Sequence, residues 1–160
     1  MTASRPAGVH SYFDPDLMVS LELPDDWETG ATDDFPLVLL APTDHGFRAN
    51  VGFSQRTLDP PTKDGFVAAI EQLKIEQARD FAGYELVGER RHVQDNCPAY
   101  LLRCRWDLDE GPTRVAQVAA LYAVGPERLV EVHATTLAEL EGEYLPVFQQ
   151  VLDSLRFVPT

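Results

Sequence analysis

The sequence is short of basic residues and has no long apolar run, and both shortages restrict its function. It has 13 Lys and Arg residues against 26 Asp and Glu residues, a formal net charge of −13 over 160 residues. Because phosphate groups are bound by positive charge, we expect neither a nucleic acid nor an anionic membrane surface as partner. No run approaches the roughly 18 apolar residues of a membrane-spanning helix, so we expect no membrane insertion.

Cysteine is also scarce, with two residues in the chain, Cys97 and Cys104. They lie at or near one expected strand, and if that strand is continuous a rise of about 3.3 Å per residue separates them by roughly 23 Å. A disulfide requires Cα atoms within about 7 Å, so the two thiols stay unpaired, which favours a reducing compartment. The first ten residues lack the apolar region of a signal peptide. We therefore expect a cytoplasmic protein.

Motifs of catalysis and of cofactor binding are missing as well. The nearest approach to the hydrolase motif G-x-S-x-G is Gly52-Phe53-Ser54-Gln55-Arg56, which lacks the second glycine. No glycine cluster precedes a helix-like segment, and the four histidines are scattered outside any metal-ligand spacing. We expect no enzyme activity, no cofactor and no metal site.

What the sequence does contain is a stretch of four strand-like runs joined by three short turns. The runs are Tyr84–Gln94, Pro98–Leu108, Thr113–Val124 and Leu129–Thr136. Asn, Asp, Gly and Pro fill the turns, because these residues tolerate or preset turn geometry. The pattern predicts an antiparallel meander.

Three further strands are expected before the first helix: Leu17–Leu23, the apolar run enclosed by Pro36 and Pro42, and Phe47–Thr57. The first and third alternate apolar and polar side chains, and the second is apolar throughout. The acidic segment Glu28–Phe35 is expected to be a loop. Residues 1–11 are expected to form a disordered tail before a single domain over residues 12–158.

Two segments have helical periodicity. Lys63–Ala82 carries apolar residues at a spacing of three to four, and Gly83 follows at the position where a glycine ends a helix. In the segment Leu137–Leu155, Pro146 predicts a kink, or a helix that starts near Leu145. The expected fold is therefore of the α+β class: an α/β/α sandwich with an antiparallel sheet of six or seven strands and two main helices.

Three segments resemble one superfamily. Val19–Trp27 resembles its opening strand with a following Leu-Pro and Trp, and Gly88 with Ala99-Tyr100 resembles its strand–turn–strand after the first helix. Phe148–Phe157 resembles its closing helix, with Leu155 in place of the usual aromatic residue. The chain thus resembles the PsbP-like superfamily, which includes the photosystem protein PsbP, the Ran-binding Mog protein and DcrB- and LpqN-like bacterial proteins.

This resemblance, over about residues 12–158, implies an α/β/α sandwich and no common enzyme activity. Members mostly bind other proteins, so it implies a non-catalytic adaptor or chaperone-like domain that acts as a monomer or homodimer. The partner would be another protein, with a secreted or acidic client as a candidate. Two alternatives stay open: a carrier of a small apolar or amphipathic ligand, and an Eag-type secretion chaperone, which this chain resembles in size and acidity.

Candidate partner-binding residues come first from an arginine cluster on adjacent expected strands: Arg90, Arg91, Arg103, Arg105 and Arg114. Trp106 lies among them, and Arg and Trp are favoured anchors of interfaces. One interpretation is a docking patch for an acidic segment. The alternative is ion pairing with the chain's own Glu85, Glu89, Asp107 and Asp109.

A second group lies on the last two strands of the meander. If Gly125–Arg128 closes the hairpin with Val124 opposite Leu129, then Tyr122 faces Glu131, and His133 shares their face. Such a trio is typical of a pH-sensitive site or of a satisfied polar network. The candidate partner-binding residues are therefore Arg103, Arg105, Trp106, Tyr122, Glu131 and His133.

Overall fold

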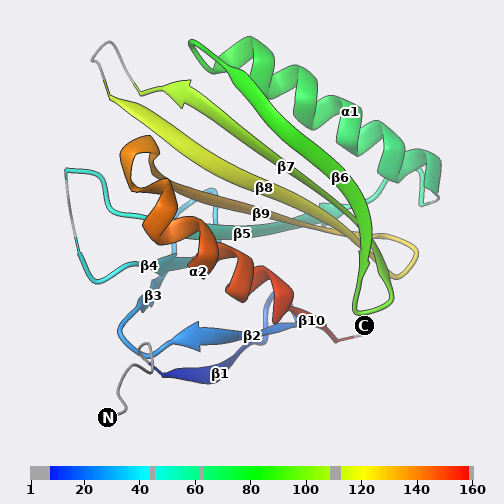
Figure 1. The fold of residues 1–160 in the computed structure, drawn as a ribbon. Coiled ribbons are helices and arrows are strands. Elements are labelled where there is room, and N and C mark those ends of the chain that lie inside the picture. Colours follow the sequence, from blue (N-terminus) through cyan, green and yellow to red (C-terminus); the bar gives the residue numbers. More distant parts are fainter. Residues whose placement is uncertain (1–7, 44–45, 62, 109–112, 159–160) are drawn as a thin grey trace.

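A computed structural model describes residues 8–43, 46–61, 63–108 and 113–158, which form two helices and two antiparallel sheets (Figure 1). In spatial order, the large sheet contains β3 (Glu28–Gly30), β4 (Leu37–Leu40), β5 (Asn50–Thr57), β9 (Arg128–Leu137), β8 (Arg114–Val124), β7 (Cys97–Asp107) and β6 (Glu85–Gln94). The small sheet contains β1 (Val9–Asp14), β2 (Val19–Pro24) and β10 (Arg156–Phe157). The helices are α1 (Lys63–Asp80) and α2 (Glu141–Asp153), the second preceded by the 3-10 turn η1 (Ala138–Leu140). The predicted α+β sandwich with a seven-stranded sheet is confirmed.

The main core fills the space between the large sheet, α2 and the small sheet. Figure 1 shows α2 in front of the large sheet and next to β2. Phe148 of α2 is fully buried, and Trp27, in the turn after β2, meets its ring edge-on at 6.5 Å between centroids. The Oγ of Ser154, at the end of α2, accepts a hydrogen bond of 2.8 Å from the Glu22 amide in β2. These contacts hold the small sheet and α2 together as one layer.

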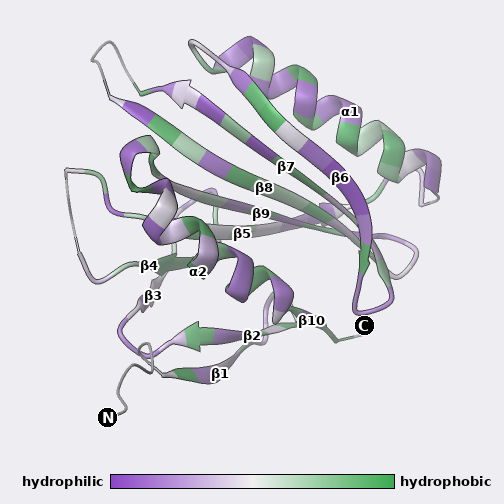
Figure 2. Cartoon of the chain, viewed as in Figure 1, coloured by the Kyte–Doolittle hydropathy of each residue, from purple (hydrophilic) through white to green (hydrophobic). Residues whose placement is uncertain are grey.

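A second core lies on the opposite face of the large sheet, under α1. Phe66, Ile70 and Leu73 of α1 pack against residues such as Leu102 of β7 and Leu121 of β8. Because β8 contributes to both cores, its residues from Val115 to Val124 are all buried, and Figure 2 shows mainly hydrophobic positions along it. Because α1 packs chiefly on β7 and β8, it covers only part of this face. In the described part of the chain, neither helix has the length and apolarity to cross a membrane.

The element boundaries confirm the meander and correct three expectations. β1 begins at Val9, where it pairs with Pro24 of β2, so the predicted disordered tail is wrong for residues 9–11; residues 1–7 lie outside the described residues. The predicted loop Glu28–Phe35 contains the short strand β3, which pairs with β4. Helix α2 starts at Glu141 and runs through Pro146, so the alternative of a helix that starts near Leu145 is wrong.

Pro146 is tolerated because of its place near the start of α2. It cannot donate to the carbonyl of Gly142, one turn earlier. Gly142 and Pro146 are both exposed, so water can satisfy that carbonyl. The helix therefore does not need to begin after the proline.

Candidate functional site

The predicted trio of Tyr122, Glu131 and His133 does not form, because the β8–β9 pairing is shifted by one residue. Val124 pairs with Arg128, so the connection has three residues rather than four, and Tyr122 lies opposite Val130. A shift of one residue moves side chains to the other face of a sheet. Tyr122 therefore lies buried in the core beneath α2, and burial raises its pKa. Glu131 and His133 alternate with core residues and point to the α1 side.

The sheet likewise separates Trp106 from Arg103 and Arg105. Trp106 packs on the α1 side, stacked on Phe81 with ring centroids 4.1 Å apart. Arg103 and Arg105 point to the α2 side, where both bind Glu141 at the first residue of α2. These three residues do not form one docking surface.

The arginine cluster is mostly paired within the chain. Nε of Arg105 lies 2.5 Å from Oε1 of Glu141, and this hydrogen bond is the main cause that lowers the pKa of Glu141. Arg114 binds Glu85 at 3.1 Å and Asp107 at 2.8 Å. For Arg103, Arg105 and Arg114 the structure thus shows the self-pairing alternative.

The remaining members of that prediction behave differently. Glu89 binds Lys74 and the Tyr100 hydroxyl rather than an arginine. Arg90 and Arg91 have no ion-pair partner among the described residues. Asp109 lies outside the described residues.

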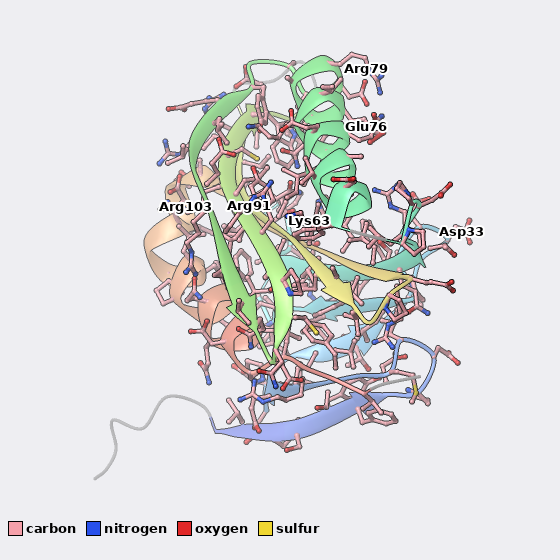
Figure 3. All side chains as sticks on the ribbon, turned by 90° about the vertical axis from the view of Figure 1, so that its right-hand side faces the viewer. Asp33, Lys63, Glu76, Arg79, Arg91 and Arg103 are labelled. Atoms are coloured by element: carbon pink, nitrogen blue, oxygen red, sulfur yellow. The ribbon has the colours of Figure 1, made fainter. Side chains whose placement is uncertain are left out.

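Two regions remain as candidates, and the first is the part of the α1-side face that α1 leaves uncovered. We call it the open half-sheet: the α1-side residues of β3, β4, β5 and the middle of β9. Its members alternate with core residues and include Leu40, Asn50, Ser54, Arg56, Glu131 and His133. Figure 3 shows Asp33, in the segment after β3, on the same side of the sheet as α1.

A polar cluster occupies the centre of the open half-sheet. Nε2 of His133 and Oε2 of Glu131 are 2.6 Å apart, and Arg56 lies 4.0 Å from the other carboxylate oxygen. Burial raises the pKa of Glu131, but the hydrogen bond with His133 and the charges of His133 and Arg56 outweigh it, so the net pKa is lowered. The Phe35 ring lies edge-on to His133 at 5.9 Å. Glu131 is thus a half-buried carboxylate held by two neighbours.

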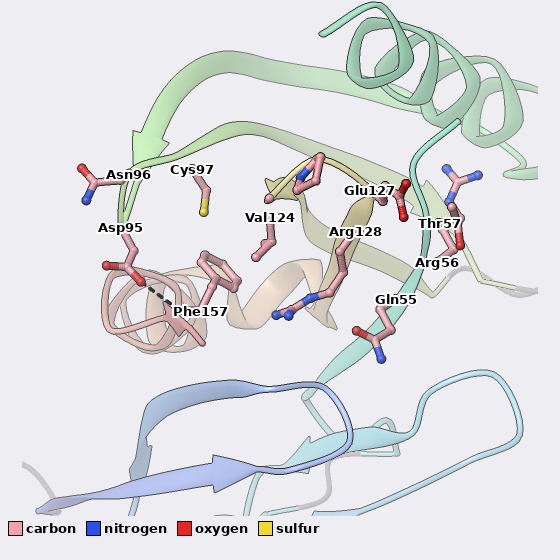
Figure 4. A pocket seen from close by; sticks show the side chains of 12 residues that line it. Gln55, Arg56, Thr57, Asp95, Asn96, Cys97, Val124, Glu127, Arg128 and Phe157 are labelled. Carbon is pink, nitrogen blue, oxygen red and sulfur yellow. Dashed lines mark hydrogen bonds between the residues drawn. The ribbon is translucent and has the colours of Figure 1, made fainter. Parts of the chain in front are cut away.

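The second region is a cleft at the end of the large sheet, which we call the end cleft. It has a volume of about 870 Å³ and lies where the β6–β7 turn, the β8–β9 turn, the end of β5 and β10 meet (Figure 4). Val124 and Phe157 form apolar parts of its lining, beside Cys97. In Figure 4 the Arg128 side chain extends into the cleft toward Phe157.

Arg128 is held by backbone carbonyls, and no carboxylate among the described residues binds it. Its two terminal nitrogens donate to the carbonyls of Val158 at 3.1 Å and Met18 at 3.2 Å. Its Nε is buried and has no hydrogen-bond partner among the described residues. Burial lowers the pKa of Arg128. The guanidinium thus keeps unused donor capacity within the cleft.

The chemistry of the end cleft favours binding over reaction. Burial, with the nearby charge of Asp95, raises the pKa of Cys97, so its thiol is protonated near neutral pH and is a weak nucleophile. The Asp95 carboxylate accepts a hydrogen bond of 2.8 Å from the Phe157 amide. Within the described residues, no three His, Cys, Asp or Glu side chains come together in a way that could hold a metal ion.

The architecture is similar to that of several solved protein structures. No family model matches the chain, and no curated protein matches it in sequence. The solution structure of cyanobacterial PsbP (CyanoP) from Synechocystis sp. PCC 6803 superimposes with a TM-score of 0.69 at 14% identity, over 99% of this chain and 97% of that one. The chain has the PsbP-like fold.

Other proteins with the PsbP-like fold are also similar. LpqN of Mycobacterium tuberculosis, involved in cell envelope biogenesis, has a TM-score of 0.67 at 15% identity, over 94% of this chain and 91% of that one. The Saccharomyces cerevisiae Ran-binding protein Mog1p has a TM-score of 0.59 at 10% identity, over 96% of this chain and 97% of that one. At such identities the likeness concerns the fold alone.

Sequence reasoning missed the end cleft and Arg128. One indication of this site is present in the sequence: the turn at Gly125-Pro126 predicts that Arg128 lies next to the start of a strand. The partners of Arg128 are backbone carbonyls 30 and 110 residues away, and a carbonyl is present in every residue. The bonds that define this site therefore leave no pattern in side-chain types.

Proposed function

We propose that the chain is a non-catalytic protein-binding domain that receives its partner on the open half-sheet. The observation that carries the proposal is the incomplete coverage of the α1-side face. α1 packs on β7 and β8, whereas β5 and the middle of β9 present half-buried polar side chains there. A half-buried polar surface around one aromatic ring, Phe35, is suited to form part of a protein interface.

The fold comparison supports the class of function. Mog1p, which shares the PsbP-like fold, is a Ran-binding protein. Burial raises the pKa of both thiols, Cys97 and Cys104, so both are weak nucleophiles, which agrees with a binding role.

The charges of the open half-sheet favour a basic partner surface. Arg56 in the open half-sheet is paired with Glu131 at 4.0 Å, and Arg48, two residues before β5, is paired with Glu28 of β3 at 3.3 Å. Asp33 and Asp34 beside the open half-sheet are exposed and have no ion-pair partner among the described residues. With a formal net charge of −13, the protein would attract a basic surface, because complementary potentials raise association rates. We therefore propose a basic partner in place of the acidic client suggested by the arginine cluster, because most of that cluster is paired with carboxylates of the chain itself.

The test compares two variants with the same change of charge in affinity capture from the source cells. Asp33→Lys with Asp34→Lys alters the edge of the open half-sheet, and Glu139→Lys with Glu143→Lys alters exposed positions near the start of α2. We expect a stoichiometric protein partner with the wild type and the α2 variant, and its loss with the Asp33/Asp34 variant. Circular dichroism of each variant confirms that it is folded. Equal retention by both variants would place the partner elsewhere.

A further inference from the structure

The end cleft has an apolar part of its lining beside a cation, Arg128, that has no carboxylate partner among the described residues. Val124 and Phe157 belong to the main core cluster, and Cys97 packs against it. The Phe157 ring continues into the core, with its centroid 5.0 Å from that of Tyr122. An apolar group entering the cleft would therefore extend the contacts of the core rather than lie on a polar surface.

Arg128 differs from Arg105 and Arg114, two other arginines of the large sheet. Arg105 and Arg114 each bind carboxylates, whereas Arg128 has none within the described residues. A guanidinium has five N–H donors, and only two of its nitrogens are engaged here, both by neutral carbonyls. A partly buried cation without a counter-ion costs free energy. The chain has 26 acidic residues, yet none of those described is placed beside Arg128 to offset this cost. A ligand anion would supply the missing counter-charge through charge-assisted hydrogen bonds.

The other charges of the end cleft limit how negative that ligand can be. Arg56 and Arg128 line it together with Asp95 and Glu127. The two carboxylates would repel a dianion such as phosphate more strongly than a monoanion. A phosphate would also leave the apolar lining uncovered.

We propose that the end cleft binds a carboxylate carried on an apolar chain, with the carboxylate on Arg128 and the chain over Val124 and Phe157. Its volume of about 870 Å³ falls in the range of small-ligand pockets, roughly 300–1,000 Å³. The small-ligand role, which the sequence left open, is thereby given a binding site in the end cleft and a ligand class. The inference is independent of the protein-binding role, because the lining that carries it lies on the α2 side of the sheet. The variants that test the protein-binding role leave that lining unchanged.

Two sources supply this chemistry: a free aliphatic acid, and the C-terminus of a polypeptide that ends in an apolar residue. The probes are octanoate with octan-1-ol as its uncharged match, and a short peptide ending in a free Leu carboxylate with its C-terminal amide as match. Each pair keeps the apolar group and changes the head group alone.

Titration of the full chain, followed by two-dimensional NMR, measures affinity and location together. We expect shifts centred on Val124 and Phe157, and at least about tenfold tighter binding of the carboxylate than of its uncharged match, as for a charge-assisted hydrogen bond. Arg128→Gln should remove this preference, and the matched variant Arg79→Gln, which makes the same change at an exposed position of α1 outside the cleft lining, should retain it. Binding by octanoate alone assigns a free acid, and binding by the peptide acid, with or without octanoate, admits a chain terminus; both support the proposal.

Three results would overturn it: equal affinity for the charged and uncharged probes, binding with shifts away from the cleft, or no binding of either acid at millimolar concentration. Because Arg128 also bonds two carbonyls, Arg128→Gln can fail to fold. The ratio of octanoate to octan-1-ol affinity in the wild type then decides the question alone.

Discussion

A buried hydrogen-bond relay fixes where α1 lies on the large sheet, and its removal makes a quantitative prediction. Nε2 of Gln77 in α1 donates to Oε1 of Gln117 in β8 at 3.0 Å, and Nε2 of Gln117 donates to the Thr135 hydroxyl in β9 at 3.1 Å. All three side chains are buried, with 3%, 5% and 8% of their surface exposed. The Tyr84 hydroxyl also donates to Gln77 at 3.0 Å. The relay lies at the boundary between the part of the face that α1 covers and the open half-sheet.

Gln117→Leu removes two hydrogen bonds and leaves the Gln77 amide buried without its acceptor. A lost hydrogen bond costs about 1 kcal/mol, and an unsatisfied buried group about 1–3 kcal/mol, so we expect a loss of roughly 2–4 kcal/mol in the free energy of unfolding. Gln77→Leu should cost about as much, because it strands Oε1 of Gln117. The double variant removes both ends of the central bond, so its cost should be about 1–2 kcal/mol smaller than the sum of the two.

Urea unfolding, followed by circular dichroism, measures all four free energies of this cycle. Gln72→Leu is the matched control, because it makes the same change at an exposed position of α1; it should alter stability by less than about 0.5 kcal/mol. Additivity of Gln77→Leu and Gln117→Leu within about 0.5 kcal/mol would refute the relay as the link between α1 and the sheet.

Three further predictions concern single groups. Stability should fall as the pH drops below about 4.3, the ordinary pKa of Glu, and Glu131→Gln should flatten the fall. Burial raises the pKa of Glu131, but the hydrogen bond with His133 and the charges of His133 and Arg56 together outweigh it, so the stabilisation is present above that value and is lost as pH falls through the folded pKa. Urea unfolding across a pH series measures this, and equal slopes in both proteins would contradict it. A thiol reagent at pH 8 should modify half-buried Cys97 before Cys104, because burial raises the pKa of Cys104 to about 12; equal rates would argue against a buried Cys104. Gly83→Ala should lower the free energy of unfolding by about 1 kcal/mol or more, since φ is +63° and the added Cβ would also displace the Asp107 carboxylate; an unchanged melting temperature would contradict this.

The meander was predictable because two local signals agree along it. Apolar alternation identified each run as a strand, and turn residues marked each break, so β6 to β9 appear close to their expected bounds. At the β6–β7 turn Asp95 and Asn96 both adopt positive φ, as a two-residue hairpin requires. Local chemistry therefore suffices to place strands in order.

The register of β8 and β9 was not predictable in the same way. A connection of three residues and one of four can both accommodate Gly125-Pro126, and only the observed pairing of Val124 with Arg128 separates them. The difference of one residue moved Tyr122 into the core beneath α2 and left Glu131 on the other face. Site predictions that combine side chains of neighbouring strands are thus only as reliable as the turn count between them.

Contacts between segments that lie far apart in the sequence could not be predicted, for a different reason. Glu141 gathers Arg103 and Arg105 because α2 begins beside β7, about 36 residues away along the chain. Nothing in the local pattern distinguishes this carboxylate from the other 25 acidic residues. The pairing alternative was foreseen for the arginines, but their main partner was not.

The central claim, that a protein partner docks on the open half-sheet, is tested most directly by hydrogen–deuterium exchange of the captured complex against the free protein. The account predicts slower exchange on binding in residues 30–40 and 50–56, with β6 unchanged. Protection confined to β6 and the exposed face of α1, with β4 and β5 exchanging as in the free protein, would contradict it.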